Sequence, residues 1–195
     1  THQAFIEKLM LMAVNEGENV VRLKGGDPFI FGRGGEEVEH LRAAGIDVQV
    51  VNGITAGLAG MTGLGAPLTH REHAHGVVFV TGHAKPGDRG TDWPQLAHTA
   101  RQAKLTLVIY MGVSNLDTIS EGLLQGLPAS TPVAIVQHAS LPTQRQVLTT
   151  LGDLSGTVQH ERLQSPSIIV VGDVVQGARA WGKPQQSLHS TALQA

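Results

Sequence analysis

Apolar and polar positions follow one another along the chain in blocks of helical and strand-like spacing. Residues 3–16 carry apolar side chains at helical spacing, including Phe5 and Leu9, and so predict an amphipathic helix. Short apolar runs followed by a glycine-containing loop and a helical pattern predict strand–loop–helix units. The strands expected in this half are residues 19–23 and 47–51, and the further helices are residues 36–44 and 55–64. This order is typical of a parallel, doubly wound α/β sheet.

The pattern changes at residues 65–76, where Pro67 and the polar run THREHAHG predict a hinge. Beyond the hinge the run LTLVIY predicts the clearest strand. The expected strands are residues 77–81, 105–110, 133–137, 146–150 and 167–171, and the expected helices are residues 93–103 and 114–124. We therefore divide the chain into an N-terminal α/β subdomain at 1–69, a hinge at 70–76, a C-terminal α/β subdomain at 77–175 and a Gln/Ser-rich flexible tail at 176–195.

Composition narrows the possible functions. Of 195 residues, 41% are hydrophobic and 15% charged, which suits a packed globular protein. The formal net charge of -2 argues against a nucleic-acid partner, which would favour a basic excess. No apolar run reaches the ~18 residues that a membrane-spanning helix needs, so we expect no membrane partner. Zero Cys excludes disulfides, thiolate catalysis and Cys-based zinc sites, and fits the cytoplasm. The 24 Gly suggest many tight turns beside ligands.

The segment VVRLKGGDPFIFGRGGEE at residues 20–37 is the strongest motif. Gly25 and Gly26 end a predicted strand, where the missing Cβ atoms let a ligand touch the backbone. Asp27 adds a carboxylate at the same place. A glycine turn with an Asp cap explains GGDP alone equally well. The spacing matches neither a P-loop nor G-x-G-x-x-G, so a phosphate cradle is disfavoured.

This segment closely resembles the central signature of the tetrapyrrole methylase family, and within it of the uroporphyrinogen-III C-methyltransferases. Five further segments occur in the order of that family. They are GITAG (53–57), PLTHR (67–71), VTGH (80–83), YMG (110–112) and SPSIIVVGDVV (165–175). The resemblance covers roughly residues 1–175, and six segments in order make it specific, although GITAG or YMG alone would be weak.

The resemblance implies two α/β subdomains of the tetrapyrrole methylase type, with S-adenosyl-L-methionine bound in the cleft between them. It assigns the cofactor contacts to Gly25, Gly26, Asp27, Ile30, Thr55, Ala56, Met111 and Ala139. Ala139 departs from the family, which often has Gly in this segment. A lone Met such as Met111 more often fills a core than contacts a cofactor.

The resemblance also implies a tetrapyrrole substrate, uroporphyrinogen III, methylated at C2 and C7 to give precorrin-2, and a homodimeric enzyme. A substrate rich in carboxylates needs guanidinium groups, which bind carboxylates in two-pronged fashion. Arg33 and Arg71 match family positions that line the tetrapyrrole site. Glu36 matches another and could accept a proton. Glu36 could equally well only stabilise the first turn of a helix.

The cluster His70, His73 and His75 offers potential metal ligands, with Glu72 as the one nearby carboxylate. A metal site needs about three ligands supported by an ordered second shell of partners. We expect solvated histidines and no metal.

The family's opening glycine-rich loop, and an Asp and a Lys implicated in its chemistry, would lie before Thr1. We therefore expect the chain to be the larger C-terminal part of such an enzyme and to be inactive alone. Three other hypotheses stay open. One is another tetrapyrrole or precorrin methylase, or a relative acting on RNA or diphthamide. Another is a non-catalytic cofactor-binding fragment. The third and weakest is a metal protein built on the histidine cluster.

Overall fold

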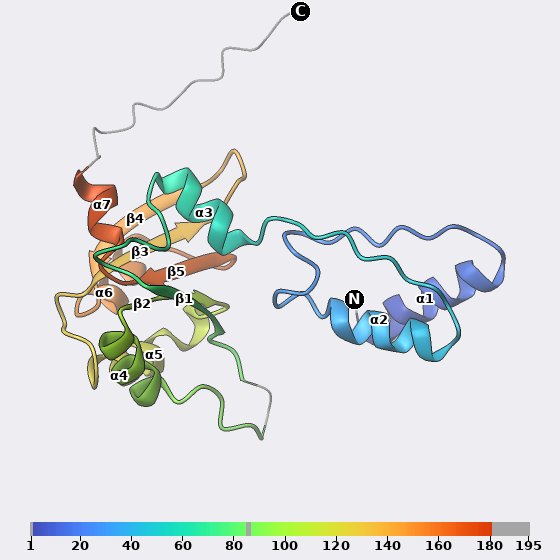
Figure 1. Cartoon of the computed structure of the whole chain (residues 1–195), viewed down its shortest axis with the longest axis horizontal. Coiled ribbons are helices and arrows are strands. Elements are labelled where there is room, and N and C mark those ends of the chain that lie inside the picture. The colour runs from blue at the N-terminus through green and yellow to red at the C-terminus, as the bar shows by residue number, and fades with distance from the viewer. Residues whose placement is uncertain (1, 85–86, 181–195) are drawn as a thin grey trace, which may run out of the picture. The chain divides into compact units, whose positions relative to one another are not determined.

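The computed structural model describes residues 2–84 and 87–180, and its contacts divide the chain into two units between Leu58 and Ala59 (Figure 1). This division falls inside α3 (Ala56–Leu64), before the predicted hinge at 70–76. In the first unit α1 (Gln3–Asn15) packs on α2 (Gly34–Ala43). Met10 and Leu41 are the buried apolar side chains of this unit's described residues. The predicted helices are confirmed, α2 beginning two residues early.

The predicted strands at residues 19–23 and 47–51 are wrong. Both segments are irregular, and neither pairs with another described segment. Val21, Leu23 and Val51 are 81%, 82% and 83% exposed. An apolar run shows that a segment suits a strand, but a strand exists only where a neighbour takes up its backbone N–H and C=O groups. The described residues of this unit supply no such neighbour.

The second unit contains a five-stranded sheet in the order β1-β2-β5-β3-β4. Its strands are β1 (Gly76–Thr81), β2 (Leu105–Tyr110), β3 (Pro132–Gln137), β4 (Arg145–Thr150) and β5 (Ser167–Val171). Each lies within one residue of its predicted bounds. Only β1 and β2 of this sheet pair in parallel. The parallel sheet expected of residues 19–64 is not formed, because residues 19–23 and 47–51 are irregular. Strand β5 lies antiparallel between β2 and β3, and β4 is antiparallel to β3.

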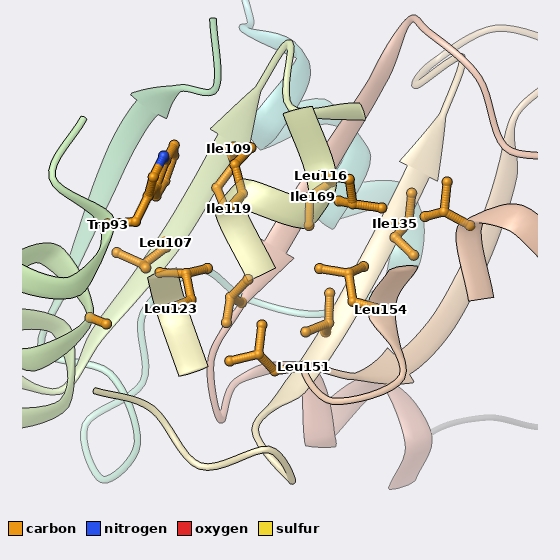
Figure 2. Packing of buried hydrophobic residues seen from close by; sticks show 14 of the residues in the cluster. Trp93, Leu107, Ile109, Leu116, Ile119, Leu123, Ile135, Leu151, Leu154 and Ile169 are labelled. Carbon is orange, nitrogen blue, oxygen red and sulfur yellow. The ribbon is translucent and has the colours of Figure 1, made fainter. Parts of the chain in front are cut away.

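Helices cover both faces of this sheet (Figure 1). On one face lie α4 (Trp93–Ala103), the 3-10 turn η1 (Val113–Asn115) with α5 (Leu116–Leu124), and α6 (Leu154–His160). Their apolar side chains pack on β2, β3 and β5, as Figure 2 shows around Ile109, Ile119 and Ile169. On the other face Gly60 of α3 lies against Val136, and α7 (Val175–Ala180) packs on β3. The central strands are therefore buried on both sides, which explains their unbroken apolar runs.

Two helices differ from prediction. Helix α6 was not predicted, since LSGTVQH is short and mixed in polarity. Helix α7 contradicts the predicted tail at residues 176–180; residues 181–195 of that tail lie outside the described residues. Val175 and Ala178, three residues apart, are both buried, which holds this turn of helix against the sheet. Among the described residues no helix combines the length and apolarity needed to cross a membrane.

Candidate functional site

The glycine-rich segment of the first unit folds back on itself immediately before α2. Gly34 donates its N–H to the carbonyl oxygen of Pro28 at 3.0 Å, and a Cβ on Gly34 would collide with that oxygen. Arg33 has a φ of 57° and forms the N-cap of α2. A glycine at position 34 is thus needed to bring Pro28 close to the start of the helix.

Asp27 links this loop to Gly53, which lies just after the irregular residues 47–51. Its Oδ1 accepts the N–H of Phe29 at 2.8 Å, and its Oδ2 accepts the N–H of Gly53 at 3.2 Å. A Cβ on Gly53 would collide with the carbonyl oxygen of Gly26. The GGDP and GITAG motifs, far apart in sequence, therefore share one backbone contact.

Other predicted cofactor residues of this unit lie beside that contact. A Cβ on Gly26 would meet the Cα of Thr55 at 3.5 Å, and Thr55 is buried immediately before α3. The N–H of Ile30 is donated to the carbonyl oxygen of Asp27 at 3.3 Å. A Cβ on Gly25 would meet nothing within 4 Å, so its peptide is open to a ligand. The structure brings together Gly25, Gly26, Asp27, Ile30, Thr55 and Ala56.

Arg33 and Glu36 form an ion pair, in which Arg33 Nε donates to Glu36 Oε2 at 3.0 Å. Both side chains are about half exposed, at 54% and 50%. The hydrogen bond to Glu36 raises the pKa of Arg33 further above its usual value. A substrate carboxylate binding Arg33 would therefore compete with Glu36 for the same guanidinium.

Glu37 is a buried carboxylate that is not among the site residues predicted from the sequence. Gln3, Arg22 and Lys24 all donate hydrogen bonds to its two oxygens. Burial alone would raise the pKa of Glu37, but the hydrogen bonds from Gln3 and Lys24 and the charges of both cations outweigh it and lower the pKa. A signal existed, because Glu37 stands three residues after Gly34 and four before Leu41, on the buried face of α2.

In the second unit the VTGH and YMG motifs meet where β1 and β2 end. A Cβ on Gly82 would lie 2.5 Å from the Cα of Gly112, so a glycine is needed at position 82 for the loops to touch. Asn115 Nδ2 donates to the carbonyl oxygen of Gly82 at 2.9 Å and fixes the contact. Met111 has a left-handed φ of 53° and a 47% exposed side chain. The alternative interpretation of Met111 as a core residue is therefore wrong.

Ala139 lies at the same edge of the sheet as Met111, because β2 and β3 run in the same direction. The residues on either side, His138 and Ser140, have φ values of 52° and 67°. The N–H of His138 is donated to the carbonyl oxygen of Pro166 at 3.1 Å. A tightly bent loop thus holds Ala139 half-buried beside α3, where a Cβ on Gly60 would meet its Cβ at 3.5 Å.

Arg71 and the histidine cluster occupy a turn in which His70 and Ala74 form an isolated β-bridge. Arg71 is exposed and forms no ion pair within the described part of the chain. Potential ligand atoms of His70, Glu72 and His73 lie within 4.8 Å of one another, and all three residues are exposed. However, His70 Nδ1 accepts the N–H of Glu72 at 3.2 Å, so neutral His70 carries its proton on Nε2. Neither ring nitrogen of His70 then offers a free lone pair to a metal. The expected absence of a metal at this cluster stays a prediction.

One hollow of about 250 Å³ lies between the start of α5 and α6. Ser114, Asp117 and Gln159 contribute to its wall, and no predicted site residue does. We therefore locate the candidate site in the motif loops and not in this hollow.

The motif loops of the first unit precede α2 and α3, and those of the second unit follow β1, β2 and β3, as in an α/β protein. Residues 1–155 match the family model for the tetrapyrrole (corrin/porphyrin) methylases. The chain belongs to this family, and the predicted α/β fold of the tetrapyrrole methylase type is confirmed.

Relatives with assigned names support this membership. The chain is 48% identical over 177 residues to a uroporphyrinogen-III C-methyltransferase of Pseudomonas aeruginosa, covering 90% of this chain and 70% of that protein. It is 46% identical over 188 residues to a siroheme synthase of Azotobacter vinelandii, covering 95% of this chain. The chain spans 40% of the length of that siroheme synthase.

Solved structures agree. The native uroporphyrin III C-methyl transferase of Thermus thermophilus matches with a TM-score of 0.77 at 38% identity, over 89% of this chain and 72% of that one. The same enzyme complexed with S-adenyl homocysteine matches with a TM-score of 0.76, over 90% and 75% of the two chains. A cobalt precorrin-4 methyltransferase, at 24% identity and a TM-score of 0.77, shares the fold.

Proposed function

We propose that the chain is the methyltransferase portion of an enzyme that methylates uroporphyrinogen III at C2 and C7 to precorrin-2, with S-adenosyl-L-methionine as methyl donor. The observation that carries the proposal is the backbone contact between the GGDP and GITAG loops. It gathers the six first-unit residues to which the resemblance assigns the cofactor. The named relatives support the same reaction.

The residues present fit the proposed cofactor. The open peptide at Gly25 allows close approach of a ligand, and the carboxylate of Asp27 is fixed by two backbone N–H groups. Its remaining lone pairs can accept hydrogen bonds from hydroxyl or ammonium groups. Met111 and Ala139 are proposed to contact the cofactor as well. When bound, the cofactor supplies an activated methyl group.

For the substrate, we propose that Arg33 and Arg71 bind carboxylates of the macrocycle. Arg71 is exposed and has no ion-pair partner among the described residues, so its guanidinium is available. Glu36 would be released from Arg33 when a substrate carboxylate takes its place, and could then accept a proton. Methyl transfer is an in-line displacement, which requires the reacting atoms to be held about 3 to 3.5 Å apart. These residues orient the substrate for that step.

The test combines binding with turnover. Titration of S-adenosylhomocysteine by calorimetry should show binding, and a protein that includes the remaining length of the relatives should convert uroporphyrinogen III to precorrin-2. Gly26→Val should abolish binding, because a β-branched residue is strained at the φ of 74° of Gly26. Gly35→Val is the matched control, since a Cβ there meets nothing within 4 Å.

Different outcomes separate the hypotheses. Binding without turnover in the longer protein would favour the non-catalytic cofactor-binding alternative, and absence of binding would contradict the proposal. A cytoplasmic homodimer is part of the proposal, and light scattering after gel filtration would test its oligomeric state.

A further inference from the structure

Glu37 is the acceptor at the centre of a polar cluster that involves three parts of the first unit. Its exposed fraction is 4%. Its Oε1 accepts from Gln3 Nε2 of α1 at 2.9 Å and from Arg22 Nε and Nη2, both at 3.3 Å. Its Oε2 accepts from Lys24 Nζ at 2.9 Å. Both oxygens are therefore engaged, as a buried carboxylate requires.

Lys24 is the more buried of the two cations. Its side chain is 12% exposed, against 37% for Arg22, and its hydrogen bond to Glu37 is shorter. Charge-assisted hydrogen bonds of this length are roughly twice as strong as neutral ones. The ion pair between Lys24 and Glu37 is thus the main link between α2 and the segment before the glycine loop.

Lys24 directly precedes Gly25, and its side chain also reaches the far end of the loop. A Cβ on Gly32 would meet Lys24 Cε at 3.3 Å, so the side chain runs along the inside of the turn. Residues 19–24 make no backbone hydrogen bond to another described segment. Side chains, and not a strand ladder, therefore hold the entrance to the loop in place.

We propose that Glu37 is a positioning residue, which holds the Gly25–Asp27 loop in its ligand-binding conformation through Lys24. Glu37 is itself buried and acts by fixing the residue that directly precedes the loop. This inference rests on the proposed function, because it takes the loop to be the cofactor-binding loop.

The experiment compares Glu37→Gln, Lys24→Gln and the double variant with wild type. Glu39→Gln is the matched control, an exposed glutamate two residues along the same helix. Two readouts are taken: S-adenosylhomocysteine affinity by calorimetry, and hydrogen exchange of the amides of residues 25–34. Each single variant should weaken binding roughly tenfold and speed exchange in the loop. The double variant should show the same loss of affinity and the same loop exchange as either single variant, because both substitutions remove the same ion pair.

Each outcome decides the inference. Wild-type loop exchange and affinity in both single variants, or additive effects in the double variant, would overturn it. A lower melting temperature with unchanged loop exchange and affinity would reduce Glu37 to a structural role and likewise overturn it. If Glu37→Gln does not fold, Lys24→Gln decides alone. A wild-type chain that fails to bind S-adenosylhomocysteine contradicts the proposed function, and loop exchange then still decides the role of Glu37.

Discussion

At Gly53 the backbones of two distant loops approach so closely that a single methyl group cannot be accommodated. A Cβ there would collide with the carbonyl oxygen of Gly26, and the N–H of Gly53 is donated to Asp27. The requirement for glycine is thus a matter of contact, and it links two motifs that sequence patterns can only show separately. Arg71, in contrast, is exposed, so its proposed role depends on charge and not on packing.

Replacing Gly53 by Ala should separate the two loops and weaken the hydrogen bond to Asp27. We expect S-adenosylhomocysteine affinity to fall by about tenfold or more, since a backbone shift at this contact moves several proposed ligand residues together. Calorimetry measures the effect. Gly35→Ala, with open space at its Cβ, should bind like wild type. Equal affinities in the two variants would show that the loop contact does not matter for binding.

Replacing Arg71 by Ala should impair turnover and leave cofactor affinity nearly unchanged. Loss of one charge-assisted hydrogen bond to a substrate carboxylate should reduce kcat/KM by the equivalent of about 1.5 to 3 kcal/mol. The measurement is steady-state kinetics with uroporphyrinogen III in a protein with the full length of the relatives. Arg101→Ala, on the exposed side of α4, is the control. Wild-type kinetics for Arg71→Ala would refute the assignment.

The stabilising effect of Glu37 should depend on pH. The native pKa of Glu37 is lowered: burial raises it, but hydrogen bonds and the charges of Lys24 and Arg22 prevail. A group with a depressed native pKa contributes stability above its unfolded pKa of about 4.5 and loses it as pH falls through the native value. Hydrogen exchange in α2 should therefore differ between wild type and Glu37→Gln near pH 7, and the difference should shrink below about pH 4. If the difference in hydrogen exchange between the two proteins stays constant as the pH falls, the ionised carboxylate of Glu37 is not the source of the stabilisation.

At the scale of elements, prediction from sequence succeeded where one segment carries its own signal. Residues 106–110 of the run are buried in β2, and α4 spans residues 93–103 as predicted. Prediction failed at residues 19–23 and 47–51, because pairing depends on a neighbouring strand that the segment itself does not encode. Glu37 was missed for a similar reason, since its role depends on three hydrogen-bond partners that lie 34, 15 and 13 residues away in sequence.

Helix α4 allows a direct measurement of one such local signal. Asp92 Oδ1 accepts the N–H of Gln95 at 3.0 Å at the start of the helix, and Pro94 follows within the first turn. Asp92→Ala should lower the free energy of unfolding by about 1 kcal/mol, the usual contribution of an N-cap. Urea unfolding followed by circular dichroism provides the value, with Glu121→Ala on the exposed surface of α5 as control. No difference between the two variants would mean that the cap hydrogen bond contributes nothing.

At the scale of the whole molecule, the two units differ in how much apolar surface they bury. The second unit has a continuous core that extends from Trp93 to Val171 and involves both strands and helices (Figure 2). The described residues of the first unit contribute Met10 and Leu41 as buried apolar side chains, while Val21 and Leu23 are exposed. Because apolar burial is the main stabilising contribution to folding, the first unit should open at a much lower free energy than the second.

Limited proteolysis of the 195-residue chain tests this difference. Cleavage should occur first within residues 19–24 and 47–52, where the backbone makes few hydrogen bonds, and should leave a resistant fragment that contains β1 to β5. Mass spectrometry identifies the cleavage sites. S-adenosylhomocysteine should slow cleavage at both first-unit segments, because a ligand that binds the loops stabilises the folded form of the first unit by mass action. If the two units resist cleavage equally without ligand, the first unit is stabilised by more than its two buried apolar side chains. The expected difference in opening free energy between the units would then be wrong.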